Sequence, residues 1–379
     1  MSPIRLGFLT PSLRLGGAER WILSLASNFD PKRVSLVGTA LTEYAYSSTS
    51  IAEKLSKYMP IFAGPIHKNT AGLHDTSIIQ RFEPNASVGI SKIAYNSDVI
   101  ISWGCYHLDI ILKNYIKHTN LLSVSVSHCE GPVGEFSKFD DGATHFVSVC
   151  RVAKSIFSEE AKKKCIVIHN GADIDRVTPT VPRSKIREEW GLTDRDKIVG
   201  YVGRFSPEKN PTALVKALQC LSAEYKVILI GEGLMEAELK KELQDKAPGR
   251  YKFIAPINQI GNALQALDAL VLPSYTEAFS LSMIEAWLAG TPVVSTPVGA
   301  LRELESLFGD IVIEVPYAPE GYQLAEGIKR AVGFEGYHLA RKCRKIAWSN
   351  FTAAAMTERW TRYLESIVLD RRLSKGEKC

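Results

Sequence analysis

Residues 275–303 read YTEAFSLSMIEAWLAGTPVVSTPVGALRE and place a helix-length segment between two strand-like runs. The apolar run Ala269–Leu272 precedes the segment, and Pro292–Ser295 follows it. Glu277 lies in the turn before the helix, and Glu285 lies eight positions later, which is about 80° around a helix. Both carboxylates could therefore reach one crevice. Two solvated glutamates on a surface helix fit the spacing equally well.

The start of this predicted helix also offers backbone hydrogen-bond donors. Ala278 lies in the turn, and Phe279, Ser280 and Leu281 come at the helix N-terminus. The first N–H groups of a helix have no partner within the helix, and they favour phosphate or sugar hydroxyls. The stretch therefore predicts a strand, a ligand-binding turn and a helix.

Composition indicates a globular protein with two domains. A chain of 379 residues exceeds one typical core, and 45% hydrophobic and 23% charged residues are ordinary for such proteins. The net charge of +5 is spread over both halves. This argues against a dedicated nucleic-acid surface, and it leaves a weak attraction to a membrane surface open.

The cysteines and the apolar runs bear on the compartment. The seven cysteines form no C-x-x-C pair and no zinc pattern, which indicates reduced thiols in a reducing compartment. We find no signal-peptide pattern and no apolar run near the roughly 18–20 residues of a spanning helix. We therefore expect a cytoplasmic protein, or one peripheral to the inner face of the membrane.

The first half alternates strand-like runs with helix-length segments. The run Ile4–Leu9 leads into Gly16 and Gly17 and then a helical face. Further runs follow at Val34–Val37, Val99–Ser102, Leu121–Val126 and His145–Val149. This alternation predicts a parallel, doubly wound α/β sheet with ligands at the carboxyl ends of its strands. The two glycines suit a phosphate turn, although a tight turn explains them more simply.

Two polar features of the first half have competing interpretations. His128 ends a predicted strand, where it could bond a substrate hydroxyl, shuttle a proton, or be only a polar strand end. Asp173 and Asp175 have the D-x-D spacing of some metal sites, but no carboxylate cluster accompanies them, so we favour a structural turn. The irregular residues 63–87 are interpreted as a long loop, part of an acceptor site or merely mobile.

The second half repeats the alternation of strand-like and helix-length segments after a proline-containing polar stretch. We predict domains at residues 1–176 and 187–350, a linker at 177–186, and a C-terminal segment at 351–379. Arg204 and Lys209 follow the strand Ile198–Val202 and suit a pyrophosphate, although a solvated loop is the simpler interpretation. Later strands are predicted at Lys226–Ile230, which Glu232 follows, and at Tyr251–Ile254. A long helix over 348–368 should pack back on the first domain, before a polar tail at 371–378.

Taken together, the motifs resemble glycosyltransferase family 4. They are GGAER at 16–20, the strand-end His128, NGAD at 170–173, VGRFSPEKN at 202–210, GEG at 231–233, and EAFSLSMIE at 277–285 followed by AGTPVV. Each is weak, but their joint order across almost the whole chain is specific. The resemblance implies a GT-B architecture, in which two Rossmann-like domains face each other across a cleft. It also implies a retaining enzyme that uses a nucleotide sugar.

The resemblance also implies roles for single residues. Arg204 and Lys209 would bind the donor diphosphate, and Gly16 and Gly17 would approach it. Glu277 would bond the donor sugar, Glu285 the ribose, and His128 the sugar near its reacting carbon. Backbone N–H groups over 278–281 would bind sugar and phosphate, and Glu232 would lie near the base. His128, Arg204, Lys209 and Glu277 are thus the expected catalytic residues, and no metal or cofactor is expected.

Several alternatives stay open. Ala278 and Ala255 stand where the family commonly has glycine, and Val298-Gly299-Ala300 replaces a more usual double glycine. A sugar-nucleotide epimerase, a phosphorylase, or a silent sugar-nucleotide-binding protein would use the same architecture. The donor base (UDP or GDP), the sugar, the hydroxyl acceptor and the oligomeric state do not follow from the sequence. A glycan or lipid-linked acceptor of envelope or polysaccharide synthesis is the family-level expectation.

Overall fold

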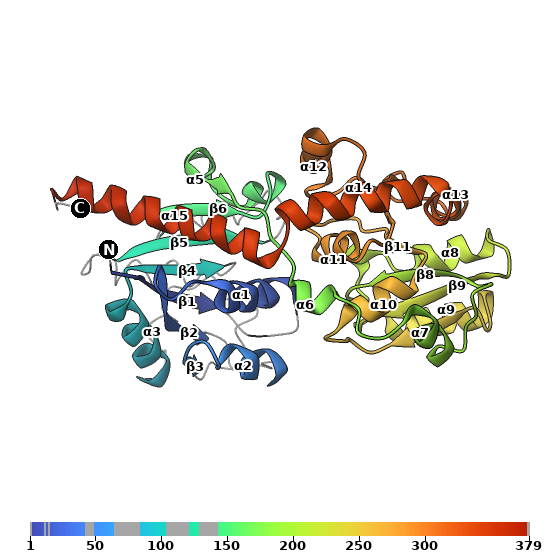
Figure 1. Ribbon diagram of the computed structural model, residues 1–379, viewed down its shortest axis with the longest axis horizontal. Coiled ribbons are helices and arrows are strands. Elements are labelled where there is room, and N and C mark those ends of the chain that lie inside the picture. Colours follow the sequence, from blue (N-terminus) through green and yellow to red (C-terminus); the bar gives the residue numbers. More distant parts are fainter. Residues whose placement is uncertain are drawn as a thin grey trace. The chain divides into compact units, whose positions relative to one another are not determined.

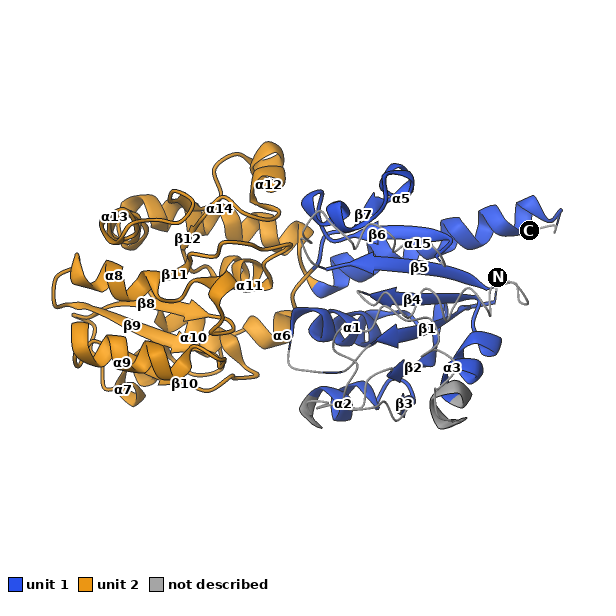
Figure 2. Ribbon diagram, turned by 180° about the vertical axis from the view of Figure 1, so that it is seen from behind, with its two compact units in different colours: residues 1–170, 353–379 blue, residues 171–352 orange. Residues whose placement is uncertain are grey.

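Two compact units make up the protein. The computed structural model describes residues 2–10, 13, 16–41, 49–63, 84–103, 121–128 and 143–376. Unit 1 comprises residues 1–170 and 353–379, and unit 2 comprises residues 171–352 (Figure 2). Each unit contains its own parallel β-sheet, so the chain builds one unit, then the second, and returns to the first for its last helix (Figure 1).

The sheet of unit 1 has the strand order β3-β2-β1-β4-β5-β6-β7, and its described pairings are all parallel. Its strands are β1 (Ile4–Thr10), β2 (Val34–Leu41), β3 (Ile61–Ala63), β4 (Val99–Trp103), β5 (Leu122–Ser127), β6 (His145–Ser148) and β7 (Ile166–Val167). The helices described with it are α1 (Gly17–Asn28), α2 (Thr49–Leu55), α3 (Pro84–Asn96), α5 (Glu159–Lys164) and α15 (Ala353–Ser374).

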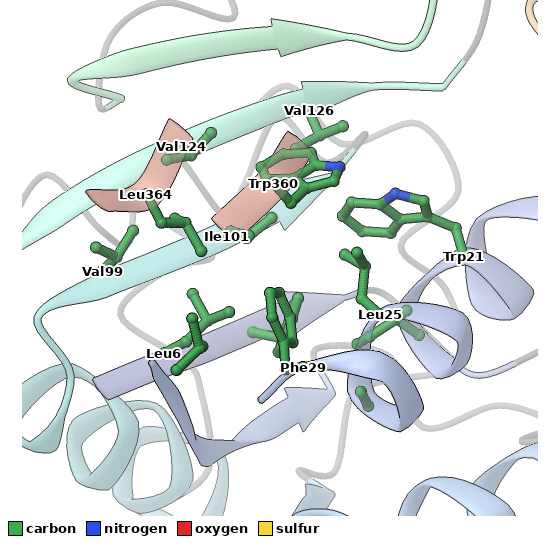
Figure 3. Close-up of a cluster of buried hydrophobic side chains, with 14 of the residues drawn as sticks. Leu6, Trp21, Leu25, Phe29, Val99, Ile101, Val124, Val126, Trp360 and Leu364 are labelled. Carbon is green, nitrogen blue, oxygen red and sulfur yellow. The ribbon is translucent and has the colours of Figure 1, made fainter. Parts of the chain in front are cut away.

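Both faces of this sheet are apolar and covered. Leu6 and Phe8 of β1 join a core with α1 and α15, whereas Leu9 joins a second cluster with α3. Side chains of successive strand residues point to opposite faces, so a strand buried on both sides is apolar at nearly every position. Figure 3 shows Trp360 of α15 beside Trp21 of α1, with ring centroids 5.4 Å apart. The last helix thus completes the core of unit 1.

The C-terminal region corrects one sequence prediction. A single helix over 348–368 was expected, but α14 (Phe334–Asn350) ends before α15 begins at Ala353. Phe351 is buried in unit 2 against Phe279, while Trp360 is buried in unit 1, so the chain must leave one core for the other between them. The polar tail expected at 371–378 is also shorter, because α15 continues to Ser374.

The sheet of unit 2 has the order β10-β9-β8-β11-β12-β13. Its strands are β8 (Lys197–Val202), β9 (Tyr225–Ile230), β10 (Tyr251–Ile254), β11 (Ala269–Leu272), β12 (Val293–Ser295) and β13 (Ile313–Glu314). Its other helices are α6 (Ile174–Val177), α7 (Arg183–Glu189), α8 (Ala213–Gln219), α9 (Glu236–Lys246), α10 (Ile260–Ala266), α11 (Leu281–Ala289), α12 (Leu301–Phe308) and α13 (Gly321–Val332). None of the described helices, in either unit, is long and apolar enough to cross a membrane.

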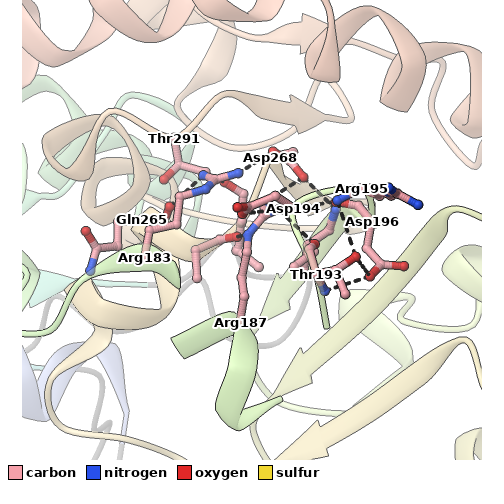
Figure 4. A network of polar contacts seen from close by, with 12 residues as sticks. Arg183, Arg187, Thr193, Asp194, Arg195, Asp196, Gln265, Asp268 and Thr291 are labelled. Atoms are coloured by element: carbon pink, nitrogen blue, oxygen red, sulfur yellow. Dashed lines mark hydrogen bonds and ion pairs between the residues drawn. The ribbon is translucent and has the colours of Figure 1, made fainter. Parts of the chain in front are cut away.

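The residues expected to form a linker, 177–186, belong to unit 2, whose first residue is Gly171. Side chains explain this difference from the expected boundary at 176. Arg183 and Arg187 of α7 both pair with Asp268, at 2.5 and 2.9 Å, and donate to carbonyls at the end of α10 (Figure 4). Cations favour the C-terminus of a helix, so these arginines bind α7 to α10.

Candidate active site

The order of strands reverses at one point in each sheet, between β1 and β4 and between β8 and β11. In open α/β sheets, ligands bind outside the carboxyl ends of the strands at such a point. In unit 2, Lys209 lies in a short 3-10 helix, Pro207–Lys209, after β8, and Glu277 lies in the turn after β11. The strand order therefore brings together two of the predicted site residues that are 68 positions apart in the sequence.

Lys209 and Glu277 form an ion pair. Lys209 Nζ lies 2.9 Å from Glu277 Oε1 and 3.3 Å from the carbonyl oxygen of Thr276. Ser274 Oγ donates to the same Glu277 oxygen at 2.9 Å. The two charged side chains are only 20% and 17% exposed. A cation and a carboxylate are thus held at one edge of the sheet in a partly desolvated setting, where electrostatic interactions are stronger than in water.

The backbone beside this pair is held in an uncommon conformation. Asn210, directly after Lys209, has a φ of 48° in the left-handed region, and its side chain donates to the Pro273 carbonyl at 3.1 Å. Asparagine tolerates that region better than most residues. The backbone N–H of Tyr275 donates to the Glu208 carbonyl at 2.8 Å. The turn after β8 and the turn after β11 are therefore joined at several points around the ion pair.

Arg204 differs from Lys209 in its exposure. Its side chain is 70% exposed and pairs with Glu208 at 3.5 Å. Burial would raise the pKa of Glu208, but hydrogen bonds from Ser206 and the backbone, together with the charge of Arg204, lower it. Tyr201 donates to the Arg204 carbonyl at 2.6 Å, and burial, with smaller contributions from Glu277 and Glu208, raises the pKa of Tyr201 well above its usual value. The backbone of Arg204 is thus anchored while its guanidinium is exposed to solvent.

Two glycines after β9 allow close packing next to Arg204. A Cβ on Gly231 would lie 1.9 Å from the Gly203 carbonyl, and one on Gly233 would lie 2.4 Å from the Phe205 carbonyl. The φ angles of these glycines are 151° and 157°, which other residues rarely adopt. Phe205 N donates to the carbonyl of the intervening Glu232 at 2.9 Å. The GEG motif is therefore required for packing, and it leaves Glu232 exposed.

Helix α11 begins two residues later than the sequence predicted, since Phe279 was expected at its N-terminus. Its first residue is Leu281, and Ser280 is the N-cap but makes no side-chain cap hydrogen bond. Of the expected donors, Ala278 and Phe279 therefore lie in the turn and are buried. The turn is fixed by Gly299, since a Cβ there would lie 2.6 Å from the Ala278 carbonyl. The start of α11 thus has no side-chain cap, and its role in anion binding stays a prediction.

Glu285 has a cation partner of its own. Its Oε1 accepts from Arg176 Nε at 2.7 Å, whereas Glu277 pairs with Lys209. The two glutamates were expected to reach one crevice, but the described contacts give them separate partners. Sequence reasoning did not single out Arg176, because a lone arginine 109 positions away carries no signal of this contact. The NGAD motif three residues before it is the nearest marker.

In unit 1, His128 and the glycine turn lie at the carboxyl ends of strands. Gly16 is the N-cap of α1 and Gly17 its first residue. His128 follows β5 and packs against Trp21 of α1, with ring centroids 4.7 Å apart. Burial lowers the pKa of His128 to about 3, so the imidazole is neutral near pH 7. Of the roles considered for it, a hydrogen bond fits this state and a proton shuttle near neutral pH does not.

Asp173 has a structural role, as the simpler interpretation expected. It is the N-cap of α6, and its Oδ1 accepts from the backbone N–H of Asp175 at 3.0 Å. This is a usual use of aspartate at the start of a helix. The D-x-D spacing is thereby explained without a ligand. The residues 63–87 that were considered for an acceptor site lie mostly outside the described part of the chain.

The site just described coincides with a known domain family. Residues 182–347 match the family described as "Glycosyl transferases group 1". This match lies wholly within unit 2. It includes Arg204, Lys209, Glu277 and Glu285, and it covers less than half of the chain.

Characterised relatives agree with this match. The chain is 33% identical over 178 residues to the D-inositol 3-phosphate glycosyltransferase of Mycolicibacterium smegmatis, covering 45% of this chain and 41% of the relative. It is 34% identical over 142 residues to the enzyme of the same name in Mycobacteroides abscessus, covering 36% and 32%. The matched part thus spans less than half the length of these relatives. These likenesses support a glycosyltransferase.

Solved structures resemble almost the whole chain. The Anabaena protein HepE in complex with UDP-glucose has a TM-score of 0.78 at 20% identity and covers 96% of this chain and 100% of its own. A glycosyltransferase from Rickettsia africae has a TM-score of 0.76 at 18% identity, covering 97% and 99%. WaaG, a glycosyltransferase involved in lipopolysaccharide biosynthesis, has a TM-score of 0.65 at 13% identity, covering 95% and 99%. The expected fold class, α/β with two Rossmann-like domains of GT-B type, is confirmed.

Proposed function

We propose that this protein is a retaining glycosyltransferase of the family 4 type. It moves a hexose from a UDP- or GDP-sugar to a hydroxyl of a glycan, a lipid-linked saccharide or another small acceptor. The observation that carries the proposal is the ion pair between Lys209 and Glu277 at the switch point of unit 2, inside the residues that match the glycosyltransferase model. The bound UDP-glucose of HepE, a protein of the same fold, supports a nucleotide-sugar donor.

The chemistry suits the charges of this site. In glycosyl transfer, the bond between the anomeric carbon and the diphosphate oxygen breaks, and the acceptor oxygen bonds to that carbon. The acceptor proton passes to the departing phosphate, so a glycoside and a nucleoside diphosphate form. Lys209, Arg204 and the start of α11 would stabilise the charge that develops on the diphosphate. With two cations there, no metal is needed for that purpose.

Other residues would orient the donor. Glu277 would bond the sugar, Glu285 the ribose, and the exposed Glu232 would lie near the base. His128 would contact the sugar as a neutral hydrogen-bonding group, and Gly16 and Gly17 would let the backbone approach the phosphate. We propose that the protein acts in the cytoplasm, where nucleotide sugars are made. We further propose that it attaches peripherally to the inner face of the membrane. Envelope or polysaccharide synthesis is the process that we propose it serves.

A panel of UDP- and GDP-sugars tests the proposal. A donor that binds the folded protein raises its melting temperature by an amount that grows with ligand concentration over Kd. We expect one sugar nucleotide to do so and to release its diphosphate only when a hydroxyl acceptor is added. Turnover without an acceptor would instead favour an epimerase. Stabilisation with no turnover under any acceptor would favour a binding protein, and no stabilisation by any sugar nucleotide would contradict the proposal.

A further inference from the structure

Arg176 connects three separate segments of unit 2. It lies in α6, and its Nε donates to Glu285 Oε1 of α11 at 2.7 Å. Its Nη1 donates to the Ile257 carbonyl at 2.9 Å and also to the Asn258 carbonyl. Residues 257 and 258 belong to the loop after β10, and the resemblance to glycosyltransferase family 4 implies that the segment 251–257 borders the nucleotide base. A single guanidinium thus contacts both the expected ribose ligand and the base loop.

The pair is buried, and one carboxylate oxygen is left over. The side chains of Arg176 and Glu285 are 13% and 7% exposed. In the described part of the chain, Glu285 Oε1 accepts from Arg176, and Oε2 makes no hydrogen bond. Glu285 is therefore fixed through one oxygen and can accept a ligand hydroxyl through the other.

We propose that Arg176 is a positioning residue for the nucleoside part of the donor. It holds Glu285 so that Oε2 accepts from the ribose hydroxyls, and it holds the loop carbonyls so that the base meets a fixed edge. The planar guanidinium suits this task because it makes several directed hydrogen bonds at once, which a lysine ammonium does not reproduce. The inference rests on the proposed function and adds a residue outside the matched family region, since that region begins at residue 182.

Binding of intact and ribose-modified nucleotides tests this role. The probes are UDP and GDP, whichever the parental protein binds, and the 2′,3′-dideoxy form of the same nucleotide, all measured by calorimetry. The variants are Arg176→Gln and the milder Arg176→Lys. We expect the dideoxy nucleotide to bind the parental protein about tenfold more weakly, because hydrogen bonds to a charged group are lost. In Arg176→Gln this difference should shrink to less than about threefold.

Arg183→Gln is the matched control. Arg183 also pairs with a carboxylate and donates to helix-end carbonyls, but its partner is Asp268. We expect it to leave the tenfold preference for the intact ribose unchanged, and we expect Arg176→Lys to give an intermediate preference. If Arg176→Gln kept the full tenfold preference, whether or not it bound both nucleotides more weakly, Arg176 would have only a structural role. That result would overturn the inference.

The same data separate this inference from the function on which it rests. A parental protein that binds neither UDP nor GDP contradicts the proposed function and removes the inference with it. A parental protein that binds one of them, with a ribose preference independent of Arg176, contradicts the inference alone. If Arg176→Gln does not fold, the comparison of Arg176→Lys with the parental protein decides, because loss of the ribose preference there has the same meaning.

Discussion

At the scale of single residues, the contact between Lys209 and Glu277 decides how the site is interpreted. If Lys209 contacted only protein groups, its ion pair with Glu277 would serve stability alone. The proposed function makes Lys209 a ligand of the donor diphosphate instead. The two roles differ in what a substitution does to turnover and to stability, so Lys209 is the most informative position for a first variant.

Lys209→Ala should lower kcat/KM for sugar transfer by about 10²–10³, the usual cost of removing one preorganised group that stabilises developing charge. Steady-state kinetics with the donor identified by thermal stabilisation measures the loss. Lys241→Ala, an exposed lysine of α9, is the control and should keep the parental rate. A Lys209→Ala protein as active as the parental one would remove Lys209 from the site.

His128 gives a prediction about pH. Its pKa is about 3 when folded and about 6.5 when unfolded, so between these values the unfolded chain binds more protons. Stability from this group is therefore complete above about pH 6.5 and is lost as the pH falls toward 3. At pH 5 the loss is roughly 2 kcal/mol relative to pH 7. Denaturation curves at both pH values should show a smaller difference for His128→Asn, and an unchanged difference would contradict the prediction.

At the scale of elements, close packing in unit 2 depends on glycines and on one buried network. The strands β8 and β9 end in turns that touch through backbone atoms, and α7 is bound to α10 through Asp268. The glycine contacts act on the turn that carries Arg204, so their loss should affect stability and donor binding. Asp268 lies at the opposite ends of β8 and β11, next to Ile198, so loss of its network should affect stability alone.

Gly231→Ala should destabilise the protein by more than about 2 kcal/mol, because backbone strain adds to the clash with the Gly203 carbonyl. Gly249→Ala is the matched control, since that glycine also has a positive φ, 70°, but has no atom within 4 Å of its Cβ position. It should cost only about 1 kcal/mol. Urea denaturation of both variants measures the difference, and equal losses would show that the close approach is unimportant.

Asp268→Asn tests the network shown in Figure 4. Asp268 accepts from Arg183, Arg187 and the backbone N–H of Ile198, and the Arg187 side chain is only 3% exposed. Removing the charge leaves the buried Arg187 with only its long pair to the exposed Asp194, at 3.9 Å, so we expect a loss of about 3 kcal/mol in chemical denaturation. Glu160→Gln breaks an exposed pair with Lys164 and should leave the denaturation curve unchanged. A similar result for both variants would contradict the expectation.

At the scale of the whole molecule, the chain crosses twice between two cores. The last helix, α15, belongs to unit 1, although the preceding helix belongs to unit 2. A substitution in α15 should therefore destabilise the sheet of unit 1, which is built from the first 170 residues. It should not destabilise unit 2, to which the preceding helix α14 belongs. This gives a prediction that compares two buried tryptophans of the same size in different cores.

Trp360→Ala should destabilise unit 1 by about 3–5 kcal/mol, and Trp287→Ala should do the same for unit 2. Both side chains are 1% exposed. Hydrogen exchange read by mass spectrometry can follow β1 and β8 separately. We expect faster exchange in β1 for the first variant and in β8 for the second. Faster exchange in β8 alone for Trp360→Ala would contradict the assignment of α15 to unit 1.

The sequence by itself determined most of the elements, because strand and helix periods, glycines and prolines act over a few residues. The two parallel sheets followed from the alternation of strands and helices. Lys209 and Glu277 became candidate site residues through their place after strands together with the family resemblance. The sequence did not reveal the short strand β13, Ile313–Glu314, whose two residues form no period. It also predicted one helix over 348–368, across the break between α14 and α15, because a helical pattern does not show where a chain changes cores.

Only the tertiary structure decided which residues meet. Strand order placed Lys209 beside Glu277, and it gave Glu285 a different partner in Arg176, 109 positions away. It also buried His128 against Trp21, which sets its pKa. A local pattern fixes the element on which a side chain lies, but its partner depends on how distant elements pack. For that reason, the sequence proposed candidate residues, and the structure supplied the pairings among them.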